Sequence, residues 1–323
     1  MTAYALLLIV GMGLLVKGAD LFVSGASNIA KALKIPPLVI GLTLVSMGTS
    51  APEASVSING AINSAADLSV GNIVGSNIFN TLFILGLSAL IAPIKIDDEV
   101  KRSDIPFMLI AYMLIPLLTL VITPMRLSAL EAVILTAAFV LYTAALIIRT
   151  KATKKRASTT TDCVRSTSTE RLKPRALLAS ALYSVVGLMG IILGGESVVQ
   201  SASEIAIDLG MSKSLVGLTI VAVGTSLPEL MTSVVAAVKK ENDIAIGNVI
   251  GSNIFNVLFI LGVSAAIKEV SLSQSAILDI AVMTGSGILL GAIALSSKTI
   301  NRAHALTFLA AYIGYTAYII VRN

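Results

Sequence analysis

Glu53 and Glu229 are the residues of this chain whose type and surroundings best suit ion chemistry. Glu53 is the only ionisable side chain within 35–66, and Glu229 is the only one within 214–238. Both segments are apolar, and a related acid, aspartate, at the centre of a membrane helix costs about 2.5–3.5 kcal/mol. A glutamate kept protonated for helix packing would explain one such residue. Two in equivalent positions favour a functional site.

A proline precedes each glutamate and predicts a break in its helix. Pro52 has no N–H for the carbonyl of Gly48, and Pro228 has none for that of Gly224. Backbone oxygens freed at this depth are tolerated only where they are buried in protein or line a wet cavity. Hydroxyl groups lie in the same turns, on Thr49, Ser50, Thr225 and Ser226. The two segments therefore predict a cluster of hard oxygen ligands.

The cation that suits such a cluster is calcium. Calcium takes roughly six to eight oxygens in a flexible shell, whereas magnesium demands a strict octahedron and keeps its water. Two ionised glutamates neutralise one divalent ion, and its departure leaves two buried negative charges unless sodium ions or protons replace it. That competition couples the two fluxes and predicts an exchanger.

The chain contains an internal repeat. The segment GTSAPE at 48–53 recurs as GTSLPE at 224–229, 176 positions later, and GNIVGSNIFN at 71–80 recurs as GNVIGSNIFN at 247–256. Five apolar spans in each half make the second copy enter the membrane from the opposite side. Such inverted repeats are typical of secondary transporters, which place the substrate site near the midplane. A duplication kept only for packing is the alternative, and the polar residues of the repeats argue against it.

The second repeated segment supplies an opposite wall for the site. The pairs Gly71/Gly75 and Gly247/Gly251 have the spacing that lets helices approach closely. The polar residues that remain are Ser76, Asn77 and Asn80, with Ser252, Asn253 and Asn256. Asn80 shares a helical face with Asn72, and we expect that face to look at the glutamates. Asn77 and Asn253 point about a quarter turn away, so helix capping or interhelical hydrogen bonds suit them equally well.

The composition predicts that these segments lie in a bilayer. Hydrophobic residues make up 56% of the chain and charged residues 13%, unlike a soluble domain. The fold class is therefore an all-α membrane protein, with ten transmembrane helices of about 20 residues in two inverted five-helix repeats. The spans are placed at 3–23, 36–62, 70–92, 105–123, 128–148, 176–200, 213–237, 245–267, 275–296 and 303–321. The first is expected to be a retained helix and not a signal peptide, since no basic region precedes it.

The repeat also predicts the domain organisation. A first five-helix repeat covers 1–148, a basic linker covers 149–175, and a second five-helix repeat covers 176–323; the polar linker is expected to be mobile. The chain has 23 Lys and Arg residues, and 19 of them lie on one side of the ten spans. The other side carries four, which are Arg126, Lys213, Lys268 and Arg322. Because basic loops stay in the cytoplasm, we expect a cytoplasmic linker, both termini outside the cell, and a prokaryotic plasma membrane location.

Other classes of function are disfavoured by the composition. Cys163 is the only cysteine and His304 the only histidine, so neither a disulfide nor a zinc or copper cluster forms within the chain, and no cofactor is expected. The pI near 9.3 reflects loops that set topology and not nucleic-acid binding, and nothing indicates an obligatory protein partner. A passive cation channel and an intramembrane hydrolase remain as alternatives, although neither Ser50 nor Ser226 has a histidine or lysine base nearby in sequence.

At its repeats the chain resembles the sodium/calcium exchanger family of the cation/calcium antiporter superfamily. The pattern Gly-Thr-Ser-x-Pro-Glu followed by Gly-Asn-x-x-Gly-Ser-Asn-x-x-Asn, present in both halves, is similar to that family's two repeats. The resemblance implies secondary active antiport of sodium against calcium by alternating access, in which the spans at 3–23 and 176–200 slide across the other eight. Proton coupling is the alternative to sodium.

The resemblance also implies the ligands. A central calcium site would use the carboxylates of Glu53 and Glu229 and the carbonyls of Thr49 and Thr225. Two flanking sodium sites would share the glutamates, one with the Ser46 carbonyl, Ser50 and Ser252, the other with the Ala222 carbonyl, Ser226 and Ser76. Asn80 and Asn256 would line the centre. Asn256 departs from the aspartate of potassium-dependent members, so potassium coupling is not expected, and the linker is too short for the calcium-sensing domains of animal exchangers.

Overall fold

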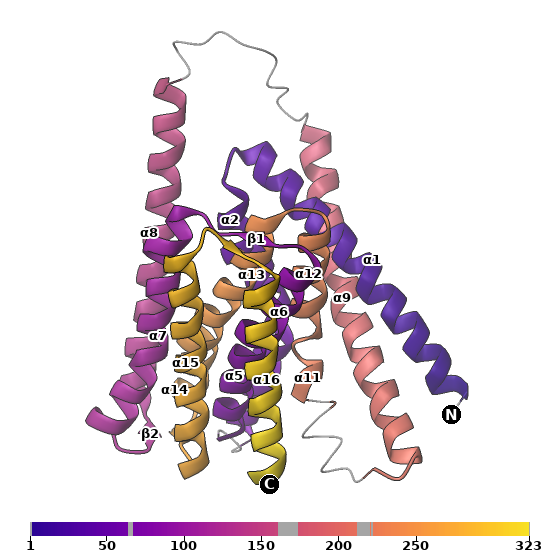
Figure 1. The fold of residues 1–323 in the computed structure, drawn as a ribbon, viewed down its shortest axis with the longest axis vertical. Coiled ribbons are helices and arrows are strands. Elements are labelled where there is room, and N and C mark those ends of the chain that lie inside the picture. The colour runs from indigo at the N-terminus through magenta and orange to yellow at the C-terminus, as the bar shows by residue number, and fades with distance from the viewer. Residues whose placement is uncertain (1, 64–66, 161–173, 212–219, 221, 323) are drawn as a thin grey trace.

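Helices account for nearly all of the computed structural model, which describes residues 2–63, 67–160, 174–211, 220 and 222–322 (Figure 1). Eight described helices are long and apolar enough to cross a membrane, and they span Thr2–Leu33, Ser69–Ile91, Val100–Leu120, Ala129–Ala152, Arg175–Asp208, Asn242–Ile267, Gln274–Ser296 and Arg302–Arg322. Two shorter apolar helices are also present: Pro37–Thr49 lies within the predicted second span, and Leu227–Val238 covers the second half of the predicted seventh span and ends one residue beyond it. The predicted all-helical membrane fold is confirmed.

The second span is broken near its middle. Its first part consists of α2 (Pro37–Ile40), the π-helical η1 (Gly41–Val45) and α3 (Ser46–Thr49), and its second part is α4 (Ala51–Ile62). The break falls at Ser50, whose φ of −80° and ψ of 10° lie outside the helical range. Pro52 occupies the first turn of α4, where a missing N–H removes no helical hydrogen bond. The break predicted from this proline is therefore present.

The remaining elements follow the order of the repeat. The first half contains α1 (Thr2–Leu33), α5 (Asp67–Ile78), η2 (Phe79–Ile84), α6 (Leu85–Ile91), η3 (Val100–Asp104), α7 (Ile105–Leu117), η4 (Leu118–Ile122) and α8 (Ala129–Thr160). The second contains α9 (Pro174–Asp208), α11 (Ala222–Gly224), α12 (Leu227–Val238), α13 (Asn242–Phe255), η7 (Asn256–Ile260), α14 (Leu261–Ile267), α15 (Gln274–Ser296) and α16 (Arg302–Arg322).

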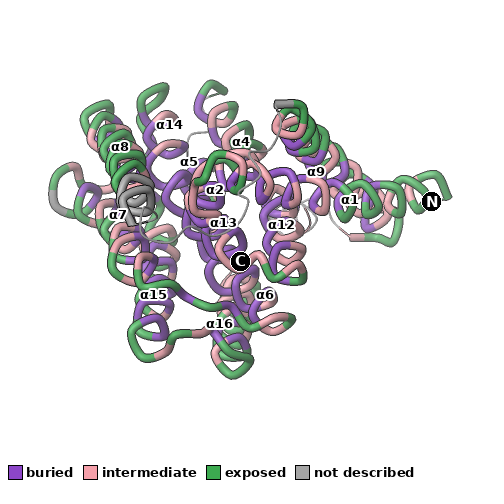
Figure 2. Tube along the Cα trace, turned by 90° about the horizontal axis from the view of Figure 1, so that it is seen from above, coloured by how far each residue is buried: buried purple, intermediate pink, exposed green. Residues whose placement is uncertain are grey.

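The third and eighth spans form the centre of the molecule. In the most apolar 18-residue stretch of each helix, 94% of the residues are buried in Asn242–Ile267 and 78% in Ser69–Ile91. The corresponding share in Arg302–Arg322 is 11%. Figure 2 shows this buried centre around α5 and α13, with exposed helices around it. The repeated polar segments therefore lie where protein, and not lipid, surrounds them.

α1 and α9 lie side by side along one flank of the molecule and run in opposite directions (Figures 1 and 2). Their backbones touch through glycines. A Cβ atom added to Gly187 would lie 2.5 Å from the backbone nitrogen of Phe22, and one added to Gly18 would lie 2.7 Å from that of Ile191. Because only glycine allows this approach, the two helices pack as one closely fitted pair.

Two short antiparallel strand pairs join the halves at opposite ends of the molecule (Figure 1). β1 (Ile94–Lys95) pairs with β4 (Thr299–Ile300), and β2 (Arg126–Leu127) pairs with β3 (Val270–Ser271). Each pair takes one strand from each repeat, so the two halves are connected through backbone hydrogen bonds outside the helical core as well as through packing within it.

The segment predicted as a linker at 149–175 is helical where the structure describes it. α8 continues to Thr160 and α9 begins at Pro174, while 161–173 lies outside the described residues. Arg149, predicted to begin the linker, instead donates to Asp104 Oδ1 over 2.9 Å and pairs with Glu99 across 2.9 Å. Figure 1 shows both termini at one end of the molecule and this end of α8 at the other.

Candidate functional site

Glu53 and Glu229 occupy corresponding places, each in the first turn of a helix directly after a break. Ser50 precedes α4, and Ser226 precedes α12 with φ of −91° and ψ of 7°. Both glutamates are fully buried, with 0% of their surface exposed. Unpaired N–H groups give the start of a helix a partial positive charge. Each break therefore favours a buried carboxylate.

The two halves exchange hydrogen bonds at these carboxylates. Ser226 Oγ donates to Glu53 Oε1 over 2.8 Å, and Ser50 Oγ donates to Glu229 Oε1 over 2.8 Å. Each glutamate is thus held by the serine of the other repeat. Ser226 Oγ also lies 3.1 Å from Ser76 Oγ on α5.

Four carboxylate and amide oxygens from these segments are buried and have no hydrogen-bond partner. They are Glu53 Oε2, Glu229 Oε2, Asn80 Oδ1 and Asn256 Oδ1. Nearly all buried polar groups in proteins are paired, and an unpaired one costs about 1–3 kcal/mol, more when it is charged. Within the described residues, no Lys or Arg forms an ion pair with either glutamate. Carboxylate and amide oxygens without donors are the ligands that a hard cation requires.

Two asparagines tie the glutamate helices to the central helices. Asn72 Nδ2 donates to Ser57 Oγ over 2.9 Å and to the carbonyl of Glu53 over 3.3 Å. Asn248 Nδ2 makes the equivalent bonds, to Ser233 Oγ over 2.9 Å and to the carbonyl of Glu229 over 3.3 Å. Helical periodicity predicts that Asn72 lies on the face toward the glutamates, but it does not predict the contacts of Ser57 and Ser233. Their signal was the same 176-residue offset, which relates 57 to 233.

The predicted carbonyl ligands lie beside the breaks. Ser46 is fully buried, and its carbonyl accepts from Ser50 N over 3.0 Å and from Ser252 Oγ over 3.4 Å. Thr49 is fully buried, and its hydroxyl donates to Asn248 Oδ1 over 3.1 Å. Thr225 Oγ1 is buried without a hydrogen-bond partner, and Ala222 is the first residue of α11. The structure thus brings Ser46, Ser50 and Ser252 together.

The glycines of the second repeated segment pack closely where the structure describes their neighbours. A Cβ added to Gly251 would lie 2.8 Å from Leu42 Cα, and one added to Gly247 would lie 2.9 Å from the Leu38 carbonyl. The packing role predicted for these glycines is confirmed. For Gly71 and Gly75 the packing role stays a prediction, because an added Cβ would meet no described atom within 4 Å and the expected partner segment is not among the described residues. Most of 213–221, which the repeat pairs with the α2 and η1 segment, lies outside the described residues.

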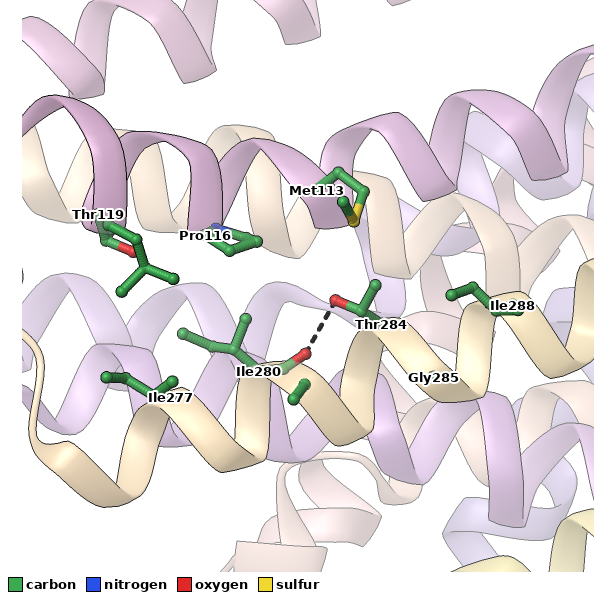
Figure 3. Close-up of a pocket in the computed structure, with 10 residues that line it drawn as sticks. Met113, Pro116, Thr119, Ile277, Ile280, Thr284, Gly285 and Ile288 are labelled. Carbon is green, nitrogen blue, oxygen red and sulfur yellow. Dashed lines mark hydrogen bonds between the residues drawn. The ribbon is translucent and has the colours of Figure 1, made fainter.

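An apolar cavity of about 300 Å³ between α7 and α15 is separate from this polar cluster (Figure 3). Its lining includes Met113, Pro116, Ile277 and Ile280, and no ionisable side chain. The hydroxyl of Thr284 points toward its own helix and donates to the Ile280 carbonyl over 2.9 Å. This cavity therefore lacks the oxygen ligands that a cation needs.

A buried carboxylate pair between two inverted helical repeats is the arrangement of a secondary ion transporter. Comparison with known proteins gives the family. The family model described as sodium/calcium exchanger protein matches residues 3–148 and 179–321. The chain belongs to this family of cation/calcium exchangers, which are multi-pass membrane transporters and not enzymes. The family predicted from the two repeats is thereby confirmed.

Several relatives match over most of their length. The chain is 36% identical to the putative antiporter CaxA of Alkalimonas amylolytica over 98% of both chains. It is 33% identical to the sodium/calcium exchanger MaX1 of Methanosarcina acetivorans, over 84% of this chain and 85% of the relative. It is 38% identical to the inner membrane protein YrbG of Escherichia coli, over 81% of this chain and 79% of the relative.

The fold is shared with a solved sodium-calcium exchanger, NCX_Mj. A structure of that protein soaked with sodium and calcium superposes with a TM-score of 0.84 at 30% identity, and the match covers 98% of both chains. A second NCX_Mj structure, soaked with sodium and strontium, gives a TM-score of 0.84 at 31% identity. The chain therefore shares the fold of that exchanger over nearly its whole length.

Proposed function

We propose that this protein exchanges sodium for calcium across the membrane by alternating access, through one site shared by Glu53 and Glu229. The observation that supports this most directly is the set of four buried, unpartnered oxygens on the two glutamates and on Asn80 and Asn256. Their equal contribution from both halves fits a single ion held on the pseudo-symmetry axis. The matches to MaX1 and NCX_Mj, both named as sodium/calcium exchangers, support the same ions.

Calcium would bind at the centre, between the carboxylates of Glu53 and Glu229 and the backbone carbonyls of Thr49 and Thr225. Two carboxylates cancel the charge of one divalent ion, so neither remains as an uncompensated charge in the protein interior. Asn80 and Asn256 would line this centre and add neutral oxygens. Calcium accepts such a mixed and flexible set of oxygens better than magnesium does.

Sodium ions would bind on either side of the calcium position. One set of ligands would be the Ser46 carbonyl with Ser50 and Ser252, and the other the Ala222 carbonyl with Ser226 and Ser76; a glutamate oxygen would join each. Hydrogen bonds already gather members of each set, since Ser252 Oγ lies 3.4 Å from the Ser46 carbonyl and Ser226 Oγ lies 3.1 Å from Ser76 Oγ. A bound ion would need a rotation of the Ser50 and Ser226 hydroxyls, which now donate to the carboxylates.

Coupling then follows from the shared glutamates. An empty site holds two buried carboxylates without a cation, which is costly in a low-dielectric interior. The protein would therefore change its accessible side only with calcium or with sodium bound. We propose that the closely packed pair of α1 and α9 moves as a unit during this change. Both helices of the pair contact the proposed site region. α1 packs against α12, which carries Glu229. Leu188 of α9 packs against Gly48, just before the first break, where an added Cβ would lie 3.2 Å from Leu188 Cδ2.

The distribution of basic residues supports a plasma membrane orientation with both termini outside and the α8–α9 connection in the cytoplasm. The E. coli relative is described as an inner membrane protein. In this orientation the end of the molecule that carries both termini would face the exterior (Figure 1).

Reconstituted vesicles test the proposal. Vesicles loaded with sodium are expected to take up radioactive calcium only while an outward sodium gradient exists, and collapse of that gradient with a sodium ionophore should stop uptake. Uptake driven equally well by a proton gradient would make the protein a calcium/proton antiporter. Calcium flux without any counter-gradient would make it a passive channel.

A further inference from the structure

Asn77 and Asn253 form a hydrogen-bonded network across the two halves, next to the proposed site. Asn77 Nδ2 donates to the backbone carbonyl of Asn253 over 3.2 Å. Asn253 Nδ2 donates to Thr81 Oγ1 over 2.9 Å. Both asparagines are fully buried. The sequence allows either helix capping or interhelical hydrogen bonds for these two asparagines, and in the structure both form interhelical bonds.

The bond from Asn77 to a backbone carbonyl fixes which way its amide lies. A carbonyl oxygen only accepts hydrogen bonds, so Asn77 must turn its Nδ2 toward Asn253 and its Oδ1 the other way. That oxygen accepts from Asn256 Nδ2 over 3.0 Å. The amide of Asn256 is thereby oriented in turn, because its Nδ2 group is engaged by Asn77.

A related arrangement occurs in the other half, where the Asn253 amide bonds to a side-chain hydroxyl, which can donate as well as accept, and not to a backbone carbonyl. Asn253 directs its Nδ2 to Thr81, so its Oδ1 is available and accepts from Asn80 Nδ2 over 3.2 Å. Asn80 and Asn256 therefore both have a hydrogen-bonded Nδ2 group. Their Oδ1 atoms are the ones that are buried without any partner. The bond from Asn256 to Asn77 joins η7 to α5, and the bond from Asn80 to Asn253 joins η2 to α13, so both connect the two halves.

We propose that Asn77 and Asn253 are positioning residues that set the orientation of the Asn256 and Asn80 amides, so that a bound cation meets amide oxygens and not amide N–H groups. This inference rests on the proposed function, since it concerns the lining of the same site. An asparagine amide has nearly equal size at its two ends, and only hydrogen bonding distinguishes them. A reversed amide would direct two N–H donors at the calcium ion and remove one of its oxygen ligands.

The expected magnitude follows from residues that orient metal ligands in other proteins, whose loss costs roughly 10- to 100-fold in affinity or activity. Leucine has the branched shape of asparagine but no polar atoms, so Asn253→Leu frees the Asn80 amide to reverse. We expect calcium affinity, measured by titration calorimetry on the purified protein in sodium-free buffer, to fall by about 10- to 100-fold. Asn77→Leu should act equally through Asn256. Asn59→Leu is the control, because Asn59 is exposed and its side chain donates to Ser55 within its own helix.

A carboxylate presents an oxygen whichever way it turns, and this separates positioning from a general structural effect. In an Asn80→Asp background, Asn253→Leu should cause no further loss of calcium affinity, while Asn77→Leu should still cause its full loss. In an Asn256→Asp background the two results should be reversed. Equal losses in all backgrounds, or wild-type affinity in both leucine variants, would overturn the inference.

The proposed function and this inference fail in different ways. If the wild-type protein binds no calcium, the proposed function is wrong. If the wild type binds calcium and the leucine variants bind it equally well, only the inference is wrong. Should the leucine variants not fold, a strontium-soaked crystal structure of the wild type decides the question. The inference requires that the bonds from Asn256 to Asn77 and from Asn80 to Asn253 persist with the ion bound, and their rupture would overturn it.

Discussion

Replacing Glu229 by glutamine removes one charge from the proposed site and leaves its main structural contact possible. The Gln carbonyl oxygen can still accept from Ser50, whose hydroxyl now donates to Glu229 Oε1 over 2.8 Å. The amide nitrogen then takes the place of Oε2, the oxygen that has no partner. A hydrogen-bond donor therefore replaces a carboxylate oxygen at the position assigned to the cation.

The size of the effect can be worked from charge. Two unit charges about 4 Å apart attract by about 4 kcal/mol at an effective dielectric constant of about 20, and a divalent ion doubles this to about 8 kcal/mol. If desolvation offsets about half of it, Glu229→Gln should weaken calcium binding by about 4 kcal/mol, or about a thousandfold. Glu53→Gln should do the same, because its Oε1 is bonded to Ser226 and its Oε2 is free in the same way.

Calcium titration of the purified variants and sodium-driven calcium uptake into vesicles measure these effects. Glu196→Gln, the same substitution at an exposed position on α9, is the matched control and should bind and exchange as the wild type does. Size-exclusion profiles and melting temperatures should show that both site variants remain folded. Near-normal exchange by either Glu53→Gln or Glu229→Gln would refute the two-carboxylate site.

Two further predictions concern the helix pair and its attachment. Gly187→Ala places a Cβ 2.5 Å from the nitrogen of Phe22 and should destabilise the protein by about 1–3 kcal/mol. Gly13→Ala, whose Cβ would meet no described atom within 4 Å, is the control and should not destabilise it. Equal melting temperatures of the two variants would contradict the backbone contact of α1 and α9. Lys239 pairs with Asp20 of α1 and donates to its carbonyl over 2.9 Å. Because this ion pair is partly exposed, Lys239→Met should lower the free energy of unfolding by no more than ~1 kcal/mol. Calcium binding should stay unchanged, and a loss of binding would show that the contact shapes the site.

The sequence by itself determined the structural features of this protein that depend on local chemistry, namely its membrane helices and the break before Glu53. A run of apolar residues forms a membrane helix wherever it lies in the chain, and a proline removes a helical hydrogen bond regardless of its neighbours. The ten spans, the break before Glu53 and the inverted order of the repeats could therefore be predicted. The 176-residue offset was informative because symmetry relates two positions without any knowledge of their contacts.

Only the tertiary structure decided which surfaces meet. Nothing in the sequence shows that Ser226 bonds to Glu53 and Ser50 to Glu229, or that Asn77 contacts the other half while Asn80 keeps a free oxygen. Such contacts depend on how the helices are placed and rotated against each other, which a periodic pattern does not specify. The same limit applies to the glycine pairs, because spacing permits a close approach but only a packed partner makes use of it, as the contacts of Gly247 and Gly251 with Leu38 and Leu42 show.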